Sequence, residues 1–163
     1  MTIYFYSTKD QYGEFSNFKA YPMELKGKTW PTVEHYFQAQ KFPGTEQEEE
    51  LRQTPSPMVV ARKGRSHKRP LRPDWEDVKD NIMREAVLAK FEQYAELRDL
   101  LLATGDQDIV EKTTRDYYWG CGTDGTGKNM LGKILMEVRA KLRDSNVGEA
   151  GRLLSDETSP EME

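Results

Sequence analysis

The longest regular pattern in the sequence is an apolar stripe in the segment that follows Asp74. Its members recur at helical spacing and are Val78, Ile82, Met83, Ala86, Val87 and Phe91. This spacing places them on one face of an α-helix, so the segment predicts a long helix that buries its stripe in a core. Asp74, with Asp77 three residues later, predicts a capping box at the start of that helix.

Shorter segments on both sides of this helix predict more helices and a little sheet. Helices are expected over 33–42, after Thr45, after Ser56, over 95–103 and over 129–142, and strands over 3–7, 21–25 and 108–113. A chain of 163 residues with 36% apolar content has room for one core. We therefore expect an α+β fold, a mostly α-helical single domain with a small β-sheet, over residues 1–143.

The last twenty residues differ in composition from this domain. Residues 144–163 carry six acidic side chains against one arginine, with few apolar residues. Such a segment does not bury enough apolar surface to offset its ordering entropy, so we expect an acidic, disordered tail. Without the tail the net charge is near zero, which neither excludes a phosphate-bearing substrate nor indicates nonspecific DNA binding.

Composition also limits the class of protein. The mean hydropathy is −0.85, and no apolar run approaches the roughly 20 residues that cross a bilayer. The N-terminus has no secretory signal, so we expect a cytoplasmic protein without membrane association. One cysteine and two histidines allow neither an internal disulfide nor a credible zinc site. We expect no metal and no cofactor.

The segment WPTVEHYFQAQKF offers the first candidate catalytic group. Glu34, Gln38 and Lys41 fall on one face of the expected helix, opposite its apolar face. With aromatic Trp30 and Tyr36 nearby, a carboxylate at Glu34 has the chemistry to stabilise an oxocarbenium-like transition state or to activate water. The alternative is that Glu34 only complements the helix dipole at its N-terminus.

The segment ARKGRSHKRPLR is strongly basic and suggests phosphate binding. Its cations are Arg62, Lys63, Arg65, Lys68, Arg69 and Arg72. Guanidinium groups suit a pyrophosphate or a nucleic-acid backbone, although a run of charges is more often a solvated face. No aromatic residue is interleaved here, so the segment does not predict a stacking platform for bases.

The segment DWEDVKDNIM places Lys79 at the edge of the apolar stripe. A partly buried lysine has a lowered pKa, and its amine can form a Schiff base with an opened ribose or protonate a leaving nitrogen. The alternative is a surface lysine whose stem covers apolar side chains.

The segment DYYWGCGTDGTGKNMLG has five glycines before or within the start of the last helix. Exposed backbone amides there can hold an anion. The stretch from Gly122 to Lys128 matches the first part of a Walker A pattern, but Asn129 replaces the Ser or Thr that would bind magnesium. We therefore reject an NTPase; simple glycine-rich turns are the alternative to an anion site.

Five segments, taken together and in this order, resemble the NADAR superfamily, and its YbiA-like branch in particular. They are FYSTKDQYGEFSNF, WPTVEHYFQAQKF, the ARKGR segment, WEDVKDNIM and DYYWGCGTDGTGKNMLGKILMEVR, and the resemblance covers roughly residues 3–142. It implies a largely α-helical N-glycosidase whose pocket accepts ribosyl phosphates or ADP-ribose and needs no metal.

The resemblance also implies which residues form the site. The catalytic candidates are Glu34, Lys79 and Asp116. The candidates for substrate binding are Ser16, Asn17, Trp30, Gln38, Arg62, Trp75, Trp119, Gly120, Gly127 and Asn129. Two mechanisms stay open, direct attack of water assisted by Glu34 and an imine formed by Lys79.

Two substrate classes are known for proteins of this kind. One is the phosphoribosylamino-pyrimidine intermediates of riboflavin synthesis, and the other is ADP-ribose attached to guanine in nucleic acid. The density of Arg and Lys over residues 62–72 favours ADP-ribosyl-guanine, and hence ADP-ribosylated nucleic acid as a partner. The alternative from another class is a noncatalytic ADP-ribose-binding module.

Overall fold

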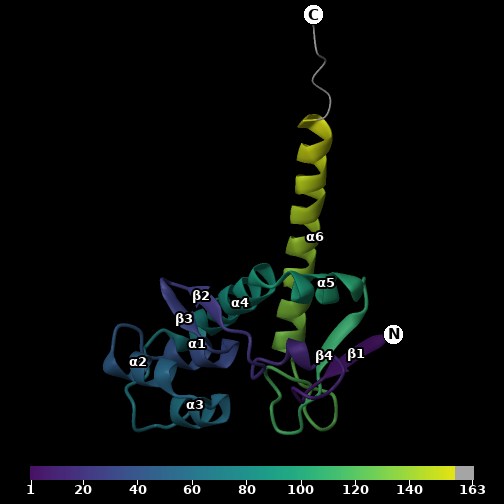
Figure 1. Cartoon of the computed structure of the whole chain (residues 1–163). Coiled ribbons are helices and arrows are strands. Elements are labelled where there is room, and N and C mark those ends of the chain that lie inside the picture. Colours follow the sequence, from purple (N-terminus) through teal and green to yellow (C-terminus); the bar gives the residue numbers. More distant parts are fainter. Residues whose placement is uncertain (157–163) are drawn as a thin grey trace, which may run out of the picture.

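The structure is a computed structural model that describes residues 1–156, with side chains through Ser145. Four short strands are present: β1 (Thr2–Phe5), β2 (Met23–Leu25), β3 (Lys28–Trp30) and β4 (Asp108–Glu111). Six α-helices are present: α1 (Val33–Ala39), α2 (Glu46–Gln53), α3 (Pro57–Gly64), α4 (Trp75–Gln93), α5 (Ala95–Ala103) and α6 (Met130–Asp156). The described chain is a mostly helical α+β domain, which confirms the expected fold class (Figure 1).

The strands form two separate two-stranded sheets. β1 pairs in parallel with β4, so that Ile3 lies opposite Ile109 and Phe5 opposite Glu111. β2 pairs antiparallel with β3, a strand that the sequence did not predict. The turn between them, Lys26 and Gly27, has positive φ at both residues (56° and 76°), which suits a tight hairpin. Lys-Gly is a weaker hairpin signal than Asn-Gly, so the sequence did not indicate that β3 follows β2 in a hairpin.

Helix α4 carries the predicted apolar stripe and lies at the centre of the domain. It packs against α1, α5 and α6 (Figure 1). Five of the six stripe residues are buried, and Val78 is half-buried at the edge. The predicted capping box is wrong, because the Asp74 carboxylate makes no cap hydrogen bond and instead pairs with Arg72.

Helix α1 is buried on every side, which corrects the two-faced helix expected from the sequence. All seven of its residues are buried, including Glu34, His35 and Gln38. Helices α2, α3 and α4 all pack against it. Thr32 caps its start by accepting a hydrogen bond from the backbone N–H of His35 at 3.2 Å. Polar side chains on α1 therefore face the interior of the domain.

Helix α6 is longer than expected. It was predicted to end at Leu142, but it runs to Asp156 and its later part extends away from the body of the domain (Figure 1). Residues 144–156 of the expected acidic tail thus belong to this helix in the structure. The rest of the predicted tail, 157–163, lies outside the described residues. No helix in residues 1–156 is long and apolar enough to cross a membrane.

Candidate active site

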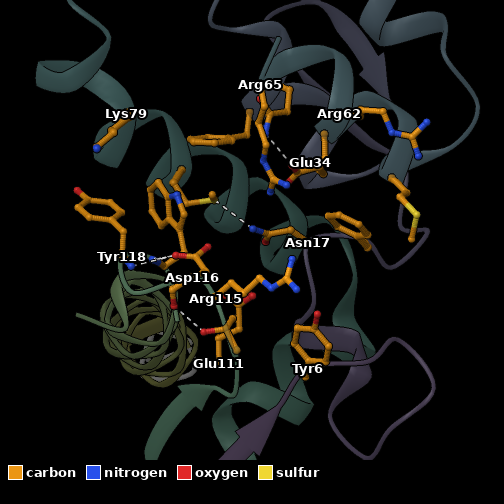
Figure 2. A pocket seen from close by; sticks show the side chains of 18 of the residues that line it. Tyr6, Asn17, Glu34, Arg62, Arg65, Lys79, Glu111, Arg115, Asp116 and Tyr118 are labelled. Carbon is orange, nitrogen blue, oxygen red and sulfur yellow. Dashed lines mark hydrogen bonds between the residues drawn. The ribbon is translucent and has the colours of Figure 1, made fainter. Parts of the chain in front are cut away.

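One large cavity gathers most of the predicted site residues. It has a volume of about 1160 Å³ and lies between α1, α3, α4, the end of β1 and the loop that follows β4 (Figure 2). Eight of the predicted residues line it: Asn17, Glu34, Gln38, Arg62, Trp75, Lys79, Asp116 and Trp119. Segments that are far apart in the sequence thus meet at one site.

Glu34 lies in the first turn of α1, with its carboxylate buried at the cavity wall. Gln38, one turn later, donates a hydrogen bond from Nε2 to Glu34 Oε1 at 2.8 Å. Burial raises the pKa of Glu34, although Gln38, Arg65 and Lys41 oppose the shift. Glu34 is therefore a strongly desolvated carboxyl group with a fixed orientation, as a catalytic acid or base requires.

Asp116 is held in place by the backbone of its own loop. Its Oδ1 accepts hydrogen bonds from the N–H groups of Tyr118 at 2.9 Å and Trp119 at 2.8 Å. Thr113 Oγ1 donates to the Asp116 carbonyl at 2.6 Å. These two N–H donors fix the orientation of the carboxyl group. Asp116 thus presents a fixed carboxylate group to the cavity.

Aromatic side chains form one wall of the cavity. The ring of Phe37 lies 5.0 Å from that of Trp75 and 5.2 Å from that of Trp119, measured between centroids. Trp119 in turn packs edge to face against Tyr118. A cavity with an aromatic wall and buried polar groups is suited to an organic ligand that carries both apolar and charged parts.

The two lysines at the cavity have different surroundings. Lys79 points towards Tyr118 (Figure 2), with its Nζ 4.0 Å from the ring centroid and 2.6 Å from Glu76 Oε2. Lys41, which was not among the predicted site residues, donates to the Gly64 carbonyl at 3.1 Å. Burial lowers the pKa of Lys41 to about 8. Near pH 8 a substantial fraction of the Lys41 amine is therefore neutral.

Glu111 is a third carboxyl group at the cavity, and sequence reasoning missed it. It is the last residue of β4, five residues before Asp116. Burial, together with Asp116 and Glu34, raises its pKa to about 8. The available signal was a glutamate within the predicted strand 108–113, close to a polar loop, but its position at the cavity depends on the parallel pairing of β4 with β1.

The basic run contributes fewer cations to the cavity than its composition suggested. Lys63 and Arg69 both pair with Glu50, and Arg72 pairs with Asp74. The run therefore leaves two arginines in the cavity lining, Arg62 and Arg65, and neither forms an ion pair within residues 1–145. Arg115 adds a third guanidinium from the loop after β4 (Figure 2). The argument from charge density for a nucleic-acid substrate no longer holds.

Two predicted binding residues near the N-terminus do not line the cavity. Ser16 Oγ accepts from the backbone N–H of Phe18 at 3.2 Å and so shapes the loop that carries Asn17. Trp30 is fully buried and donates from Nε1 to the Leu25 carbonyl at 2.9 Å. Both positions indicate structural roles, and neither residue is part of the cavity lining.

The residues of the predicted anion cradle in the glycine-rich segment are closely packed. Gly120, Gly127 and Asn129 are outside the cavity lining. A Cβ at Gly127 would overlap the carbonyl of Gly120, and one at Gly120 would overlap the side chain of Thr113. Asn129 accepts from the Glu111 N–H at 3.0 Å and donates to the Ile109 carbonyl at 2.9 Å. These residues fix β4 and its following loop.

Known proteins are similar to this chain over most of its length. The model of the NADAR domain family matches residues 4–143. N-glycosidase YbiA of Escherichia coli (strain K12) is 59% identical over 140 residues, covering 86% of this chain and 88% of that protein. A riboflavin biosynthesis protein of Vibrio vulnificus is 39% identical over 142 residues, covering 87% of this chain and 39% of that protein. The NMR structure of E. coli YbiA superposes with a TM-score of 0.84 at 57% identity, covering 90% of this chain and 87% of that one.

Proposed function

The chain belongs to the NADAR domain family, and on that premise we propose that it is an N-glycosidase that hydrolyses the bond between ribose C1 and an exocyclic nitrogen. The observation that carries this proposal is the convergence of Glu34 and Asp116 on one cavity that also holds arginines and an aromatic wall. A noncatalytic binding module, the alternative from another class, is disfavoured by the 59% identity to an N-glycosidase.

The two carboxyl groups match the needs of the reaction. As the C1–N bond breaks, positive charge develops on the ribose ring, and a nearby carboxylate stabilises it. A water molecule must then lose a proton as it attacks C1, and a second carboxylate accepts that proton. Asp116, with its two N–H donors, suits the first task, and Glu34, whose pKa is raised by burial, suits proton transfer.

Our first candidate substrate is a phosphoribosylamino-pyrimidine of riboflavin synthesis. The support is the 39% identity to a riboflavin biosynthesis protein over most of this chain. Arg62 and Arg65 supply two guanidinium groups for the single 5′-phosphate of such a substrate. The aromatic wall of Trp75 and Trp119 suits the pyrimidine ring or the apolar face of the ribose.

ADP-ribose attached to guanine is the second candidate, and the size of the cavity favours it. Pockets for small ligands usually measure about 300–1,000 Å³, and this one measures about 1160 Å³. That volume exceeds the needs of a single ribosyl phosphate with one pyrimidine. Arg115, the third guanidinium in the lining, would face the second phosphate of the larger substrate.

A side-by-side turnover assay tests both candidates. Purified protein is given a phosphoribosylamino-pyrimidine and, separately, an oligonucleotide that carries guanine-linked ADP-ribose, with Glu34→Ala as the inactive control. Cleavage of the pyrimidine alone supports the first candidate, and cleavage of the oligonucleotide alone supports the second. If neither is cleaved although ADP-ribose binds, the binding module replaces the glycosidase.

We expect Tyr6 to contact the heterocycle of the substrate. Its side chain is 60% exposed at the cavity and points towards Arg115 (Figure 2). Because stacking on an aromatic ring contributes about 1–3 kcal/mol per base, Tyr6→Ala should weaken binding of 5′-AMP roughly tenfold and leave ribose 5-phosphate unchanged. Calorimetric Kd values check this.

Tyr4 provides the matched control for this variant. It is 55% exposed on β1 and does not line the cavity. Tyr4→Ala should leave both Kd values unchanged. An equal loss of affinity for both ligands in Tyr6→Ala would contradict a contact with the base.

The imine mechanism, if it operates, should use Lys41 in place of the predicted Lys79. An imine forms from a neutral amine. Burial lowers the pKa of Lys41 to about 8, whereas Lys79 is engaged by Glu76 at 2.6 Å. Borohydride added during turnover should therefore reduce an adduct onto Lys41, identified by peptide mass spectrometry.

The two lysine variants separate the possibilities. Lys41→Ala should abolish trapping and Lys79→Ala should retain it. An adduct on Lys79 would restore the prediction from the sequence. No adduct, with full activity of Lys41→Ala, would leave direct attack of water as the mechanism.

A further inference from the structure

Glu111 is half-buried at the cavity wall, and the mechanism above gives its carboxyl group no task. Its Oε2 is buried and has no hydrogen-bond partner among the described residues. Groups of this kind are rare in folded proteins, because an unpaired buried polar atom loses its hydration without compensation. An orphan oxygen in the lining of a cavity points to a partner that arrives with the ligand.

The backbone holds Glu111 rigidly at this position. Its N–H donates to Asn129 Oδ1 at 3.0 Å, and its carbonyl accepts from the N–H groups of Thr113 and Cys121, both at 3.0 Å. Parallel pairing with β1 places it opposite Phe5. The backbone therefore fixes the point from which the Glu111 side chain enters the cavity.

The charged residues that line the same cavity as Glu111 come from four parts of the chain. They are Glu34 and Lys41 in and just after α1, Arg62 and Arg65 at the end of α3, Lys79 of α4, and Arg115 and Asp116 in the loop after β4. The carboxylates of Asp116 and Glu34, together with burial, raise the pKa of Glu111 to about 8. Glu111 forms no ion pair with any of the cations within residues 1–145. At neutral pH it is a carboxylic acid with a proton to donate.

Glu111 and Asp116 thus have opposite environments although they lie in one site. Asp116 Oδ1 accepts two backbone N–H groups. Glu111 Oε2 has no donor, which favours the neutral acid. The two carboxyl groups are therefore suited to different tasks, Glu111 to giving up a proton and Asp116 to stabilising positive charge on the ribose ring.

We propose that Glu111 is the general acid that protonates the departing exocyclic nitrogen, a role that rests on the proposed N-glycosidase function. As the C1–N bond breaks, its electron pair moves to nitrogen, which takes the proton from the Glu111 carboxyl group. The amine leaves neutral and Glu111 becomes a carboxylate. Water then bonds to C1 and loses a proton to Glu34, and transfer of that proton to Glu111 resets the site.

This role is independent of how C1 is attacked. If a lysine forms an imine with the opened ribose, the nitrogen must still leave as a neutral amine and still needs a proton. In both routes the overall reaction consumes one water, releases one amine and leaves the ribosyl product with a hydroxyl group at C1. A test of Glu111 therefore does not depend on the outcome of borohydride trapping.

Glu111→Gln tests the proposal, because glutamine keeps the shape and cannot give a proton. For the amine leaving group we expect kcat to fall about 10²–10⁴-fold, the usual contribution of a general acid. For a ribosyl 5-phosphate whose leaving group is 4-nitrophenolate, which departs without protonation, we expect less than a tenfold loss. An equal loss on both substrates, or no loss on either, would overturn the proposal.

The pH profile provides a second readout. In the unmodified protein kcat should decline above pH 8, since Glu111 loses its proton there. On the nitrophenolate substrate, where no proton is needed, this alkaline decline should be absent. The same decline on both substrates would assign it to another group and count against Glu111.

Infrared spectroscopy separates this proposal from the proposed function, because it needs no substrate. A carbonyl band of a protonated carboxylic acid should be present at pH 7 in both the unmodified protein and Glu34→Gln, vanish above pH 9 and be missing in Glu111→Gln. Its absence from the folded, unmodified protein would overturn the acid role of Glu111, whatever the activity. If the band is present but neither candidate N-glycoside is cleaved, the proposed N-glycosidase function is wrong. The proposal that Glu111 is the acid in that hydrolysis is then wrong as well.

Discussion

Glu34→Gln is expected to lower kcat about a thousandfold and still give a protein that folds at least as well as the unmodified chain. Glutamine retains an oxygen for the hydrogen bond from Gln38 but neither carries charge nor accepts a proton. General acid–base groups contribute about 10²–10⁴-fold to rate. A buried carboxyl group also costs stability because burial opposes its ionisation. Activity and stability should therefore move in opposite directions.

The pH dependence of stability provides a sharper form of this prediction. Because the folded pKa of Glu34 is raised, the folded state keeps a proton that the unfolded chain loses above its ordinary value of 4.5. The cost of burying the Glu34 carboxyl group thus grows as pH rises above 4.5, and the stability advantage of Glu34→Gln over the unmodified protein should grow with it. Urea unfolding at several pH values measures the difference.

Glu137→Gln is a suitable control. Glu137 pairs with Arg84 between α6 and α4, and its side chain is 47% exposed. Loss of this surface pair should change stability by less than about 1 kcal/mol and should leave kcat unchanged. If Glu34→Gln kept most of its activity, Glu34 would be a structural residue, and the mechanism would have to start from Asp116.

Local patterns in the sequence were sufficient to predict most of the helices. The stripe from Val78 to Phe91 predicted α4, and Ser56 with Pro57 predicted the start of α3. These signals depend on residues within a few positions of one another, which is why they can be found in a single chain. The burial of α1 on all sides depends on three other helices, so no periodicity in its seven residues could indicate it.

The same distinction explains which site residues were found. Glu34 and Asp116 belong to recognisable segments and line the cavity. Lys41 and Glu111 were overlooked as site residues because their importance comes from burial: each has a pKa shifted to about 8 by its surroundings. Glu111 lies where β4 meets β1, a contact between residues about a hundred positions apart.

Ion-pair partners determine which cations of the basic segment are available at the cavity. Its composition gave equal weight to six cations, but Glu50 pairs with Lys63 and Arg69, and Asp74 pairs with Arg72. The pairs with Glu50 join α2 to α3 and to the loop after it, and the Arg72–Asp74 pair lies just before α4. Only a tertiary structure distinguishes such cations from the arginines that remain at the cavity.

Gly127→Ala should lower the free energy of unfolding by about 3 kcal/mol, the upper part of the usual range for overpacking. A Cβ at Gly127 would overlap the backbone of Gly120 and Cys121, and backbone atoms do not move aside as flexible side chains do. The Gly127 N–H also donates to the Cys121 carbonyl at 2.7 Å, so any shift weakens that bond. The urea midpoint of unfolding measures the change.

Gly125→Ala, two residues earlier in the loop, distinguishes this packing role from anion binding. Gly125 has φ of 79° but no atom within 4 Å of an added Cβ, so alanine there should cost only about 1 kcal/mol of backbone strain. If Gly127 were instead part of a phosphate cradle, Gly127→Ala would leave the unfolding midpoint unchanged and weaken binding of ribose 5-phosphate. Because Gly127 lies outside the cavity lining, we expect the opposite pattern, with a large loss of stability and unchanged affinity in the fraction that folds.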